Sequence, residues 1–357
     1  MARRFSGHLL PATHEAAASA DAGDCLQGVK SGNVYCLPGM INIGVQKAGT
    51  GELQTWLGVH PSVKVHGGEV HFFDGEERTP SCRKHRGQLR LRYAHFLWKR
   101  QRLRASELSG RLLYEKTPAY FDRAQPRLVA CAVPSARLLL MLRDPAERAR
   151  SAYAMCQREL EARWCRSSFA EVVERMLIGG GNGTDSPLHV SRREMRRAPH
   201  LRRMFLMGHY SAFLRRWLDV FPPPTVRVLW LEQFKADPFA CMTAVERFAG
   251  LAPHPYRTVA TRNEKGLYVV GRSKSTYEKQ PEPKRRGAAQ DAASRAREAA
   301  ALQAAMGSVR VYYVPWQRRL GELLTVTNTT LLTEPPLPSS LALAGATTRE
   351  GQVGLTQ

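Results

Sequence analysis

The chain has 357 residues, 43% of them hydrophobic, so it can bury the core of one large α/β domain or two small ones and is not wholly disordered. Lys and Arg number 53 against 31 Asp and Glu, which gives a formal net charge of +22. This excess favours anionic partners, such as nucleic acid, polyanionic sugar chains, acidic membranes or phosphorylated cofactors. It is dominated by arginine, which suits bidentate recognition of phosphate or sulfate.

The cysteines and the apolar runs give information about the cellular compartment of the protein. The seven cysteines include no Cys-x-x-Cys pair, which argues against a zinc site. In a secretory compartment two pairs are candidate disulfides, with scattered buried thiols as an equal alternative. No apolar run approaches the ~20 residues of a membrane span, and the N-terminus has no convincing signal-peptide core. The candidate pairs are Cys25 with Cys36 and Cys156 with Cys165.

The first predicted elements form a strand, a loop and a helix. Residues 1–38 are rich in Ala, Gly and Ser and are expected to be poorly ordered. The apolar run at 40–45 predicts a buried strand, and apolar residues at helical spacing predict a helix with Thr50 as its N-cap and Gly58 as its end. Alternating apolar residues follow at 63–73.

The middle of the chain continues the alternation of strands and helices. Residues 111–121 predict a strand that runs into a turn, and 136–142 predict a second strand. A helix should follow, with Asp144 as its N-cap and Pro145 as its first residue. This order favours a parallel α/β sheet.

The C-terminal half adds three elements and a tail. An amphipathic helix is predicted over 202–222, a strand over 225–232 and a capped helix over 237–251. The alanine-rich stretch 278–307 should be largely helical, and 312–324 carries the last apolar cluster.

We therefore predict one P-loop-like α/β domain with a central parallel sheet flanked by helices. It should cover residues 39–325, and the polar tail 326–357 should be disordered.

The segment GVQKAGTG (44–51) raises the first question of chemistry. A glycine-rich turn between a strand and a helix presents backbone N–H groups to an anion. In nucleotide triphosphatases a lysine follows the second glycine, but here Thr50 takes that position and the lysine is Lys47. The loop therefore suits a shorter anion without an obligatory metal, with Lys47 over its terminal bridging oxygen.

Four motifs in order resemble one family. GVQKAGTG, GEVHFFD (68–74), YEKTPAYF (114–121) and LRDPAERARSAY (142–153) are similar to the sulfotransferases that use 3′-phosphoadenosine 5′-phosphosulfate (PAPS). Within them the sequence resembles the heparan sulfate 3-O-sulfotransferase and N-deacetylase/N-sulfotransferase group. The resemblance implies PAPS as co-substrate, no metal, an anionic polysaccharide acceptor and no nucleic-acid partner.

The resemblance also implies roles for individual residues. The resemblance implies that Tyr210 contacts the cofactor, and a packed aromatic side chain is the equal alternative. For Arg143, the alternative to a cofactor contact is an ion pair with Asp144 or Glu147. The 3′-phosphate would be held by Arg143 and Ser151, and the 5′-phosphosulfate by Lys47, Ala48, Gly49, Thr50 and Gly51.

The catalytic base is implied to be Glu69, which would accept the proton of the acceptor hydroxyl or amine. His71 is the alternative base or a support for Glu69, and Asp74 would orient a neighbour or cap the turn. Lys116 matches a lysine that faces the substrate and the sulfuryl group. Lys47 would stabilise charge on the leaving phosphate oxygen.

The sequence departs from the family pattern at several positions. Lys274, Ser275 and Thr276 fall where the group has Lys-Gly-Arg in the loop over the 3′-phosphate, with 283–287 as a competing candidate. Gly51 replaces an arginine of the 3-O-sulfotransferases, which weakens that specific assignment. The basic run 83–104 is either a polyanion groove or a solvated face.

Other functions remain as alternatives. A tyrosine or small-molecule sulfotransferase would have a closed apolar pocket, and a catalytically inactive polyanion-binding protein would keep only the basic surface. A P-loop kinase is disfavoured because Thr50 replaces its lysine. The resemblance implies the Golgi lumen, where the sequons at Asn182 and Asn328 would become relevant.

Overall fold

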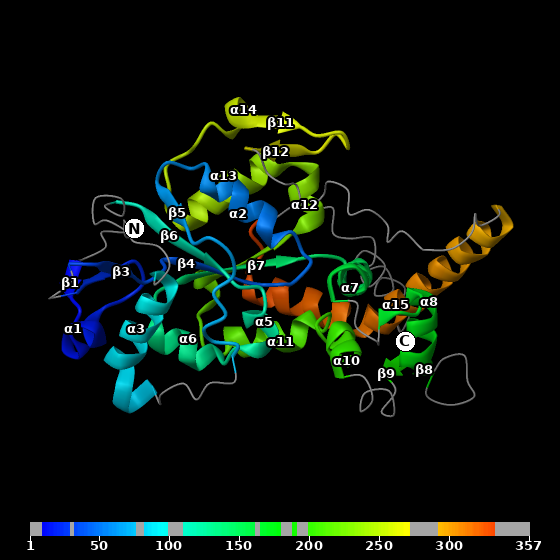
Figure 1. The fold of residues 1–357 in the computed structure, drawn as a ribbon, viewed down its shortest axis with the longest axis horizontal. Coiled ribbons are helices and arrows are strands. Elements are labelled where there is room, and N and C mark those ends of the chain that lie inside the picture. Colours follow the sequence, from blue (N-terminus) through cyan, green and yellow to red (C-terminus); the bar gives the residue numbers. More distant parts are fainter. Residues whose placement is uncertain are drawn as a thin grey trace, which may run out of the picture. The chain divides into compact units, whose positions relative to one another are not determined.

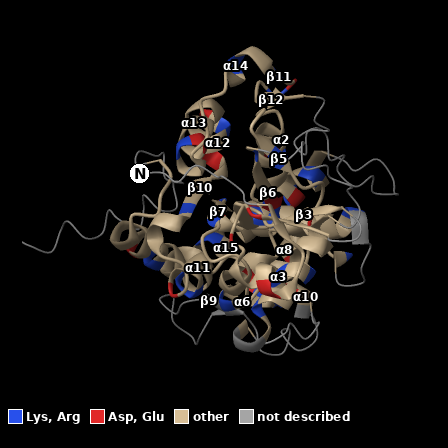
Figure 2. Cartoon of the chain, turned by 90° about the vertical axis from the view of Figure 1, so that its left-hand side faces the viewer, with Lys and Arg blue, Asp and Glu red and all other residues tan. Residues whose placement is uncertain are grey.

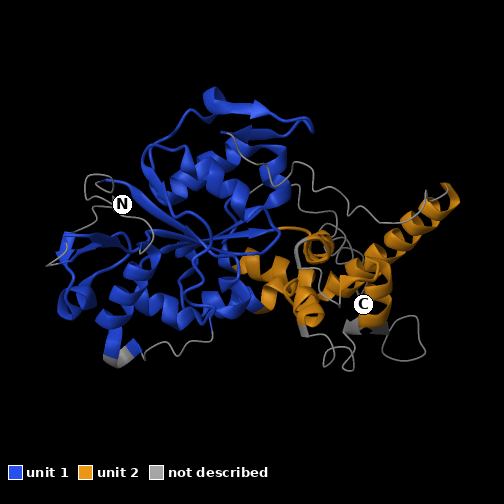
Figure 3. Ribbon diagram, viewed as in Figure 1, with its two compact units in different colours: residues 1–142, 213–278, 327–335 blue, residues 143–212, 279–326, 336–357 orange. Residues whose placement is uncertain are grey.

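The structure is a computed structural model, and it divides the chain into two compact units. Unit 1 comprises residues 1–142, 213–278 and 327–335, and unit 2 comprises 143–212, 279–326 and 336–357 (Figure 3). We describe each unit by itself. The residues that the structure describes are 9–28, 32–75, 82–98, 110–160, 165–179, 188–190, 199–271 and 292–332.

A five-stranded parallel sheet forms the centre of unit 1, in the order β10-β7-β4-β6-β5. All five residues of β4 and of β6 are buried, because a parallel sheet is covered on both faces. Helices α2, α12 and α13 lie on one side, and α3, α5 and α6 on the other (Figure 1). The strands are β4 (Met40–Gly44), β5 (Val63–Val65), β6 (Leu112–Lys116), β7 (Arg137–Leu142) and β10 (Val226–Trp230).

Two helices of unit 1, α2 and α13, were predicted from the sequence with small shifts at their ends, and the other helices of this unit, apart from α11, were not predicted. Asp237 caps α13 with its side chain, and Gly250 ends it in the left-handed conformation. Helix α2 begins at Thr50, so its N-cap is Gly49 and not Thr50. The helices are α1 (His14–Ser19), α2 (Thr50–Gly58), α3 (Cys82–Trp98), α5 (Tyr120–Arg123), α6 (Pro126–Ala132), most of α11 (Tyr210–Leu218), α12 (Leu231–Ala236), α13 (Pro238–Ala249) and α14 (Tyr256–Val259).

The strands thus form the parallel sheet that the sequence predicts, and helices flank it. Ahead of β10 lies a short 3-10 turn, Pro223–Thr225. The antiparallel hairpin β11 (Ala260–Arg262) and β12 (Tyr268–Val270) completes the unit.

The N-terminal segment differs from the poorly ordered lead-in that we expected. It contains α1 and a three-stranded sheet of β1 (Leu9–Pro11), β2 (Cys25–Gln27) and β3 (Val34–Cys36). The buried Arg90 of α3 donates hydrogen bonds to the carbonyls of Ala17, Ala18 and Ala20 at the end of α1. These carbonyls have no partner within a helix, so Arg90 fixes the segment from a position about seventy residues later.

Unit 2 is mainly helical. Asp144 caps α7 by accepting a hydrogen bond from the Glu147 N–H at 2.9 Å, and Pro145 is the first helical residue, as predicted. The elements are α7 (Pro145–Met155), a π-helical turn (Cys156–Leu160), α8 (Phe169–Met176), the strand pair β8 (Leu177–Gly179) and β9 (Leu188–Val190), α10 (Pro199–Leu206) and α15 (Ala292–Thr327).

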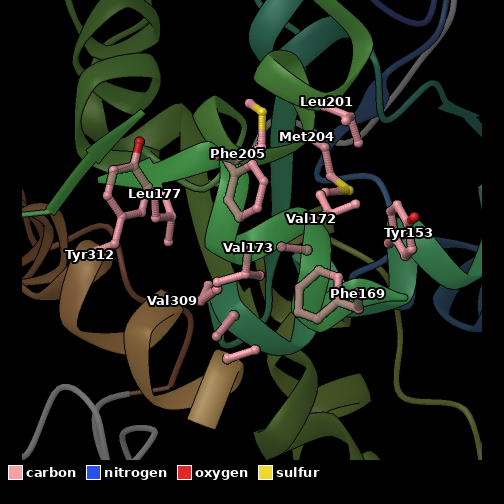
Figure 4. Close-up of a cluster of buried hydrophobic side chains, with 14 of the residues drawn as sticks. Tyr153, Phe169, Val172, Val173, Leu177, Leu201, Met204, Phe205, Val309 and Tyr312 are labelled. Atoms are coloured by element: carbon pink, nitrogen blue, oxygen red, sulfur yellow. The ribbon is translucent and has the colours of Figure 1, made fainter. Parts of the chain in front are cut away.

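The core of unit 2 is an apolar cluster. Side chains from α7, α8, α10 and α15 pack in it, among them Phe169, Phe205, Val309 and Tyr312 (Figure 4). Helix α15 thus contains both the apolar cluster at 312–324 and the described part of the alanine-rich run, which were predicted as separate stretches. The part of the alanine-rich prediction before residue 292 lies outside the described residues.

The predicted helix over 202–222 is wrong in one respect, because it is two helices. Helix α10 ends at Leu206 and α11 runs over Tyr210–Leu218, with Gly208 between them. A Cβ on Gly208 would lie 2.4 Å from Cε1 of Tyr313, so the close approach of α15 requires glycine here. The amphipathic pattern is continuous across the break and does not reveal it.

Three disulfides are present, two of them the pairs predicted from the sequence. Cys25 joins Cys36 and Cys156 joins Cys165. The third, Cys82–Cys131, links α3 to α6 and was not predicted. Cys241 is buried with a free thiol, and burial raises its pKa to about 12.

Candidate active site

The predicted anion loop follows β4, at the carboxyl edge of the sheet. The order of connections reverses on the two sides of β4, and open α/β sheets bind ligands at such a point. Lys47 (φ 70°) and Gly49 (φ 84°) both have left-handed backbone conformations, so the chain turns sharply into α2. Gly49 has no side chain to cap the first N–H groups of α2, which leaves them to a ligand.

The other predicted loop residues have different surroundings. Ala48 is fully buried and Thr50 is nearly so. Only their backbone groups, and the threonine hydroxyl, are therefore suited to a ligand. A Cβ on Gly51 would meet no atom within 4 Å, so this position faces open space at the start of the helix.

A chain of four polar side chains lies beside the end of β6. Lys116, the last residue of β6, donates from Nζ to Oε1 of Glu69 at 3.1 Å. The other oxygen of Glu69, Oε2, is 3.1 Å from Nε2 of His71. Nδ1 of His71 is in turn 2.8 Å from Oδ2 of Asp74. The structure thus brings together all four residues that the sequence predicted around the base.

Exposure differs sharply along this chain. The side chain of Asp74 is 2% exposed and that of Lys116 is 10% exposed, whereas Glu69 is 37% and His71 is 52% exposed. Asp74 and Lys116 are therefore fixed supports, and Glu69 and His71 can be reached from solvent. Each carboxylate oxygen has two lone pairs, so Glu69 can accept a further proton donor.

The segment that carries Glu69 and His71 is held by hydrogen bonds to residues that the sequence analysis missed. The N–H of Val70 donates to Oγ1 of Thr117 at 2.9 Å, and the N–H of Phe72 donates to the hydroxyl of Tyr120 at 3.1 Å. Glu115, which precedes Lys116 in β6, is fully buried. The sequence signal was a glutamate within the apolar run LLYEK of β6.

Arg143 and Ser151 belong to unit 2. Arg143 follows the last residue of β7, and Nη2 of Arg143 lies 3.6 Å from Oε2 of Glu147, so it makes the ion pair that we weighed as the alternative. Ser151 lies on α7, about two turns after Arg143.

Tyr210 is almost fully buried, and its hydroxyl donates to the carbonyl oxygen of Arg143 at 2.9 Å. Its contact in the structure is therefore with the backbone that presents Arg143.

Several predictions concern residues beyond the described ranges. Lys274, Ser275, Thr276 and the competing segment 283–287 all lie outside them, as does Asn182. The basic run 83–104 is described only in part, and its exposed basic side chains on α3 include Arg86 and Arg92. Figure 2 shows that Lys and Arg are spread over many elements.

Within the described ranges, no group of three or more His, Cys, Asp or Glu side chains is arranged to hold a metal ion. No helix in the part of the chain that the structure describes is long and apolar enough to cross a membrane.

Comparisons with known proteins give a consistent result. The family model described as "Sulfotransferase domain" matches residues 38–291. The human bifunctional heparan sulfate N-deacetylase/N-sulfotransferase 3 is 28% identical over 220 residues, which cover 61% of this chain and 23% of that protein. The mouse heparan sulfate glucosamine 3-O-sulfotransferase 3B1 is 30% identical over 217 residues, which cover 60% of this chain and 46% of that protein. The alignments thus span less than half of either relative.

A solved structure has a similar fold. The sulfotransferase from Alicyclobacillus acidocaldarius matches with a TM-score of 0.51 at 22% sequence identity. The match covers 81% of this chain and 96% of that one. It bears on the fold, and it agrees with the parallel α/β sheet described above.

Proposed function

Because this chain belongs to the sulfotransferase domain family, we propose that it transfers the sulfuryl group of PAPS to a hydroxyl or amine of an anionic glycan. The observation that carries the proposal is the partly exposed Glu69, held between Lys116 and His71 at the end of β6, which pairs with the strand that the predicted anion loop follows. A carboxylate open to solvent and fixed on both oxygens is suited to accept a proton from an incoming acceptor.

The proposed reaction is a single in-line displacement. Glu69 accepts the proton as the acceptor oxygen or nitrogen attacks sulfur. The new bond to sulfur forms as the bond from sulfur to the bridging phosphate oxygen breaks, and 3′-phosphoadenosine 5′-phosphate leaves with that electron pair. No further reactant is needed for the balance.

The loop residues would hold the phosphosulfate. The N–H groups at the start of α2 face the 5′-phosphate, and Lys47 neutralises the charge that develops on the leaving oxygen. Lys116 holds Glu69 in place through its hydrogen bond to Oε1, and its ammonium group attracts the sulfuryl oxygens. His71, fixed by Asp74, orients the second oxygen of Glu69.

Arg143 and Ser151 are proposed to bind the 3′-phosphate. The support is the position of Arg143 directly after β7 and of Ser151 on the helix that follows. The buried Tyr210 fixes the Arg143 carbonyl and so limits the movement of this arginine. Lys274, Ser275 and Thr276 remain candidates for the same phosphate.

The acceptor class rests on the relatives and on charge. The two curated relatives described above are named for heparan sulfate, and the net charge of +22 suits a polyanionic polymer. A protein tyrosine or a small hydroxyl compound is the second acceptor class. A tyrosine peptide in the assay below distinguishes the two.

We propose that the protein works in an oxidising, Golgi-like lumen. The support is the set of three disulfides, which persist in such compartments and are rare in the cytosol. The sequon residue Asn328 is also exposed, so a glycan could be attached there.

The test is transfer of ³⁵S from labelled PAPS to heparan sulfate, N-desulfated heparan sulfate, chondroitin and a tyrosine peptide. Glu69→Gln should reduce the rate by about 10²- to 10⁴-fold, because it removes the base and keeps the shape. Glu174→Gln, which changes an exposed carboxylate of α8, is the matched control. Transfer by Glu69→Gln at the wild-type rate would contradict the assignment of the base.

A binding measurement separates the cofactor from the acceptor. Calorimetry with 3′-phosphoadenosine 5′-phosphate should give the same affinity for wild type and Glu69→Gln. No binding to wild type would contradict the sulfotransferase proposal as a whole.

A further inference from the structure

Glu115 is a buried carboxylate that the proposed transfer does not use. It lies in β6 directly before Lys116, and its side chain is 0% exposed. A carboxylate in such a place is costly unless donors surround it. Its partners therefore indicate what it does.

Three hydroxyl groups are hydrogen-bond partners of the Glu115 carboxylate. Thr117 donates from Oγ1 to Oε1 at 3.1 Å, and Tyr93 of α3 donates its hydroxyl hydrogen to Oε2. Tyr120 of α5 is a third hydrogen-bond partner of the carboxylate. All three of these residues are fully buried.

Two of these hydroxyls also hold the segment that carries the proposed base. Oγ1 of Thr117 accepts the N–H of Val70 at 2.9 Å, and the hydroxyl of Tyr120 accepts the N–H of Phe72 at 3.1 Å. Val70 follows Glu69, and Phe72 follows His71. The two anchored N–H groups therefore lie on either side of His71, which has a left-handed backbone (φ 56°).

The direction of these hydrogen bonds follows from the charge on Glu115. An ionised carboxylate only accepts hydrogen bonds, so each hydroxyl must turn its hydrogen towards it. The lone pairs of Thr117 and Tyr120 then face outward, where the two backbone N–H groups need acceptors. A chain of hydrogen bonds with one direction is also mutually reinforcing.

We propose that Glu115 is a positioning residue, which acts through the hydroxyls of Thr117 and Tyr120 to hold Glu69 and His71 in place for sulfuryl transfer. This inference rests on the proposed function. It assigns to the buried carboxylate a role in the rate of the reaction, and none in binding PAPS.

Protonation of Glu115 should disturb the arrangement. Burial first of all, and then the charge of Asp74, raise the pKa of Glu115 to about 7, while the hydroxyls of Tyr93, Tyr120 and Thr117 lower it. Its partner across the sheet on β4 is the uncharged Ile41. Once protonated, Glu115 must donate its own hydrogen to one of the three hydroxyls. At Thr117 or Tyr120 this donation competes with the backbone N–H for the same oxygen.

The test compares Glu115→Gln with wild type in two independent readouts. The side-chain amide of glutamine donates where the carboxylate accepts, so one hydroxyl loses its orientation. Amide hydrogen exchange at Val70 and Phe72, followed by NMR, should become about tenfold faster or more. In the PAPS assay kcat should fall by about 10- to 100-fold, with the affinity for 3′-phosphoadenosine 5′-phosphate unchanged.

The matched control is Tyr114→Phe. It removes a buried hydroxyl from the residue before Glu115 in β6. That hydroxyl makes no hydrogen bond to residues 69–74. Exchange at Val70 and Phe72 and the value of kcat should both match wild type.

A second pair of variants covers the case in which Glu115→Gln does not fold. Thr117→Val removes one acceptor and should speed exchange at Val70, whereas Thr117→Ser keeps the hydroxyl and should restore the protection. Unchanged exchange in Glu115→Gln, or in Thr117→Val if that is the variant that folds, would overturn the proposal. A loss of activity that is fully explained by weaker binding of 3′-phosphoadenosine 5′-phosphate would also overturn it.

The exchange readout also separates this inference from the proposed function. If wild type transfers no sulfuryl group to any acceptor, the proposed function fails. In that case faster exchange in Glu115→Gln would still support the anchoring of the segment, and unchanged exchange would overturn it.

Discussion

Lys116 is the residue that most directly controls the proposed base. Its ammonium group lies 3.1 Å from Glu69, and its side chain is 10% exposed, so water screens the pair only partly. A charge-assisted hydrogen bond in such a place orients the carboxylate. Removing the ammonium group should therefore affect the rate more than the fold.

We predict that Lys116→Met lowers kcat by about 10²-fold, because the base loses its charged partner and the sulfuryl oxygens lose a cation. The methionine side chain is apolar and fits the buried stem of the lysine. Initial rates with ³⁵S-labelled PAPS give the result, and Lys64→Met on β5 is the control. A wild-type kcat in Lys116→Met would contradict a role for this lysine in the transfer.

Glu115 also makes stability depend on pH. Its pKa is raised from 4.5 to about 7 in the folded state, so between these values the folded protein holds a proton that the unfolded chain has released. We predict that the free energy of unfolding falls as pH rises through this interval. The fall should be smaller in Glu115→Gln.

Urea titrations at pH 4.5, 5.5, 6.5 and 7.5 (about one-unit steps) measure this effect as the difference between wild type and Glu115→Gln. Burial also raises the pKa values of Glu52 and Glu246, so the two proteins share that part of the pH dependence. Parallel curves for the two proteins would contradict the prediction.

At the scale of single residues, the sequence marked the four side chains of the hydrogen-bonded chain and missed the buried residues behind it. The resemblance marked Glu69, His71, Asp74 and Lys116, and the structure brings all four into one hydrogen-bonded chain. Glu115 was missed, because only the structure shows which hydroxyls reach a buried carboxylate from other elements.

Among the elements, Gly208 shows how a close helix contact determines a residue. It separates α10 from α11, and the ring of Tyr313 lies against its Cα. Tyr313 is fully buried and its hydroxyl donates to the carbonyl oxygen of Phe205 at 2.6 Å, so the ring cannot move aside.

We predict that Gly208→Ala destabilises the protein by about 1–3 kcal/mol through overpacking. Gly307→Ala is the matched control, since a Cβ there meets no atom within 4 Å and the residue lies inside α15. That change should stabilise by about 0.5–1 kcal/mol, because alanine favours a helix more than glycine does. Thermal unfolding measures both, and equal shifts for the two variants would contradict the argument.

Element prediction succeeded where the signal is local and failed where it is not. Asp144 with Pro145, and Asp237 with Gly250, mark the ends of α7 and α13 in the sequence itself. The N-terminal elements depend instead on Arg90, which is distant in sequence. Their Ala-, Gly- and Ser-rich composition therefore gave no sign of order.

For the whole molecule, the division into units cuts across the predicted domain 39–325. Both units are assembled from separated stretches of the chain, with passages at residues 142–143, 212–213, 278–279 and 326–327. Two of these passages, at 142–143 and 212–213, fall within the predicted run of strands and helices, so a reading along the sequence finds one domain. The boundaries at 39 and 325 stay predictions.

We predict that the charge of the whole chain makes polymer binding depend on salt. With a net charge of +22, a polyanionic acceptor should displace many counterions, and its KM should rise roughly tenfold or more between about 50 and 200 mM NaCl. The KM of a neutral disaccharide acceptor should change much less. Equal salt dependence for both acceptors would contradict a polyanion-binding surface.

The last described residues have a consequence for the behaviour of the protein in concentrated solution. After α15, Thr329 accepts a hydrogen bond from the N–H of Val228 at 2.8 Å, and the N–H of Leu331 donates to the Val228 carbonyl at 2.8 Å. This short stretch pairs with β10, which would otherwise be the outer strand of the sheet. Unpaired outer strands recruit other chains and lead to aggregation. Three residues after a long helix thus cover the outer edge of the sheet at Val228, where a neighbouring copy of the molecule could otherwise pair.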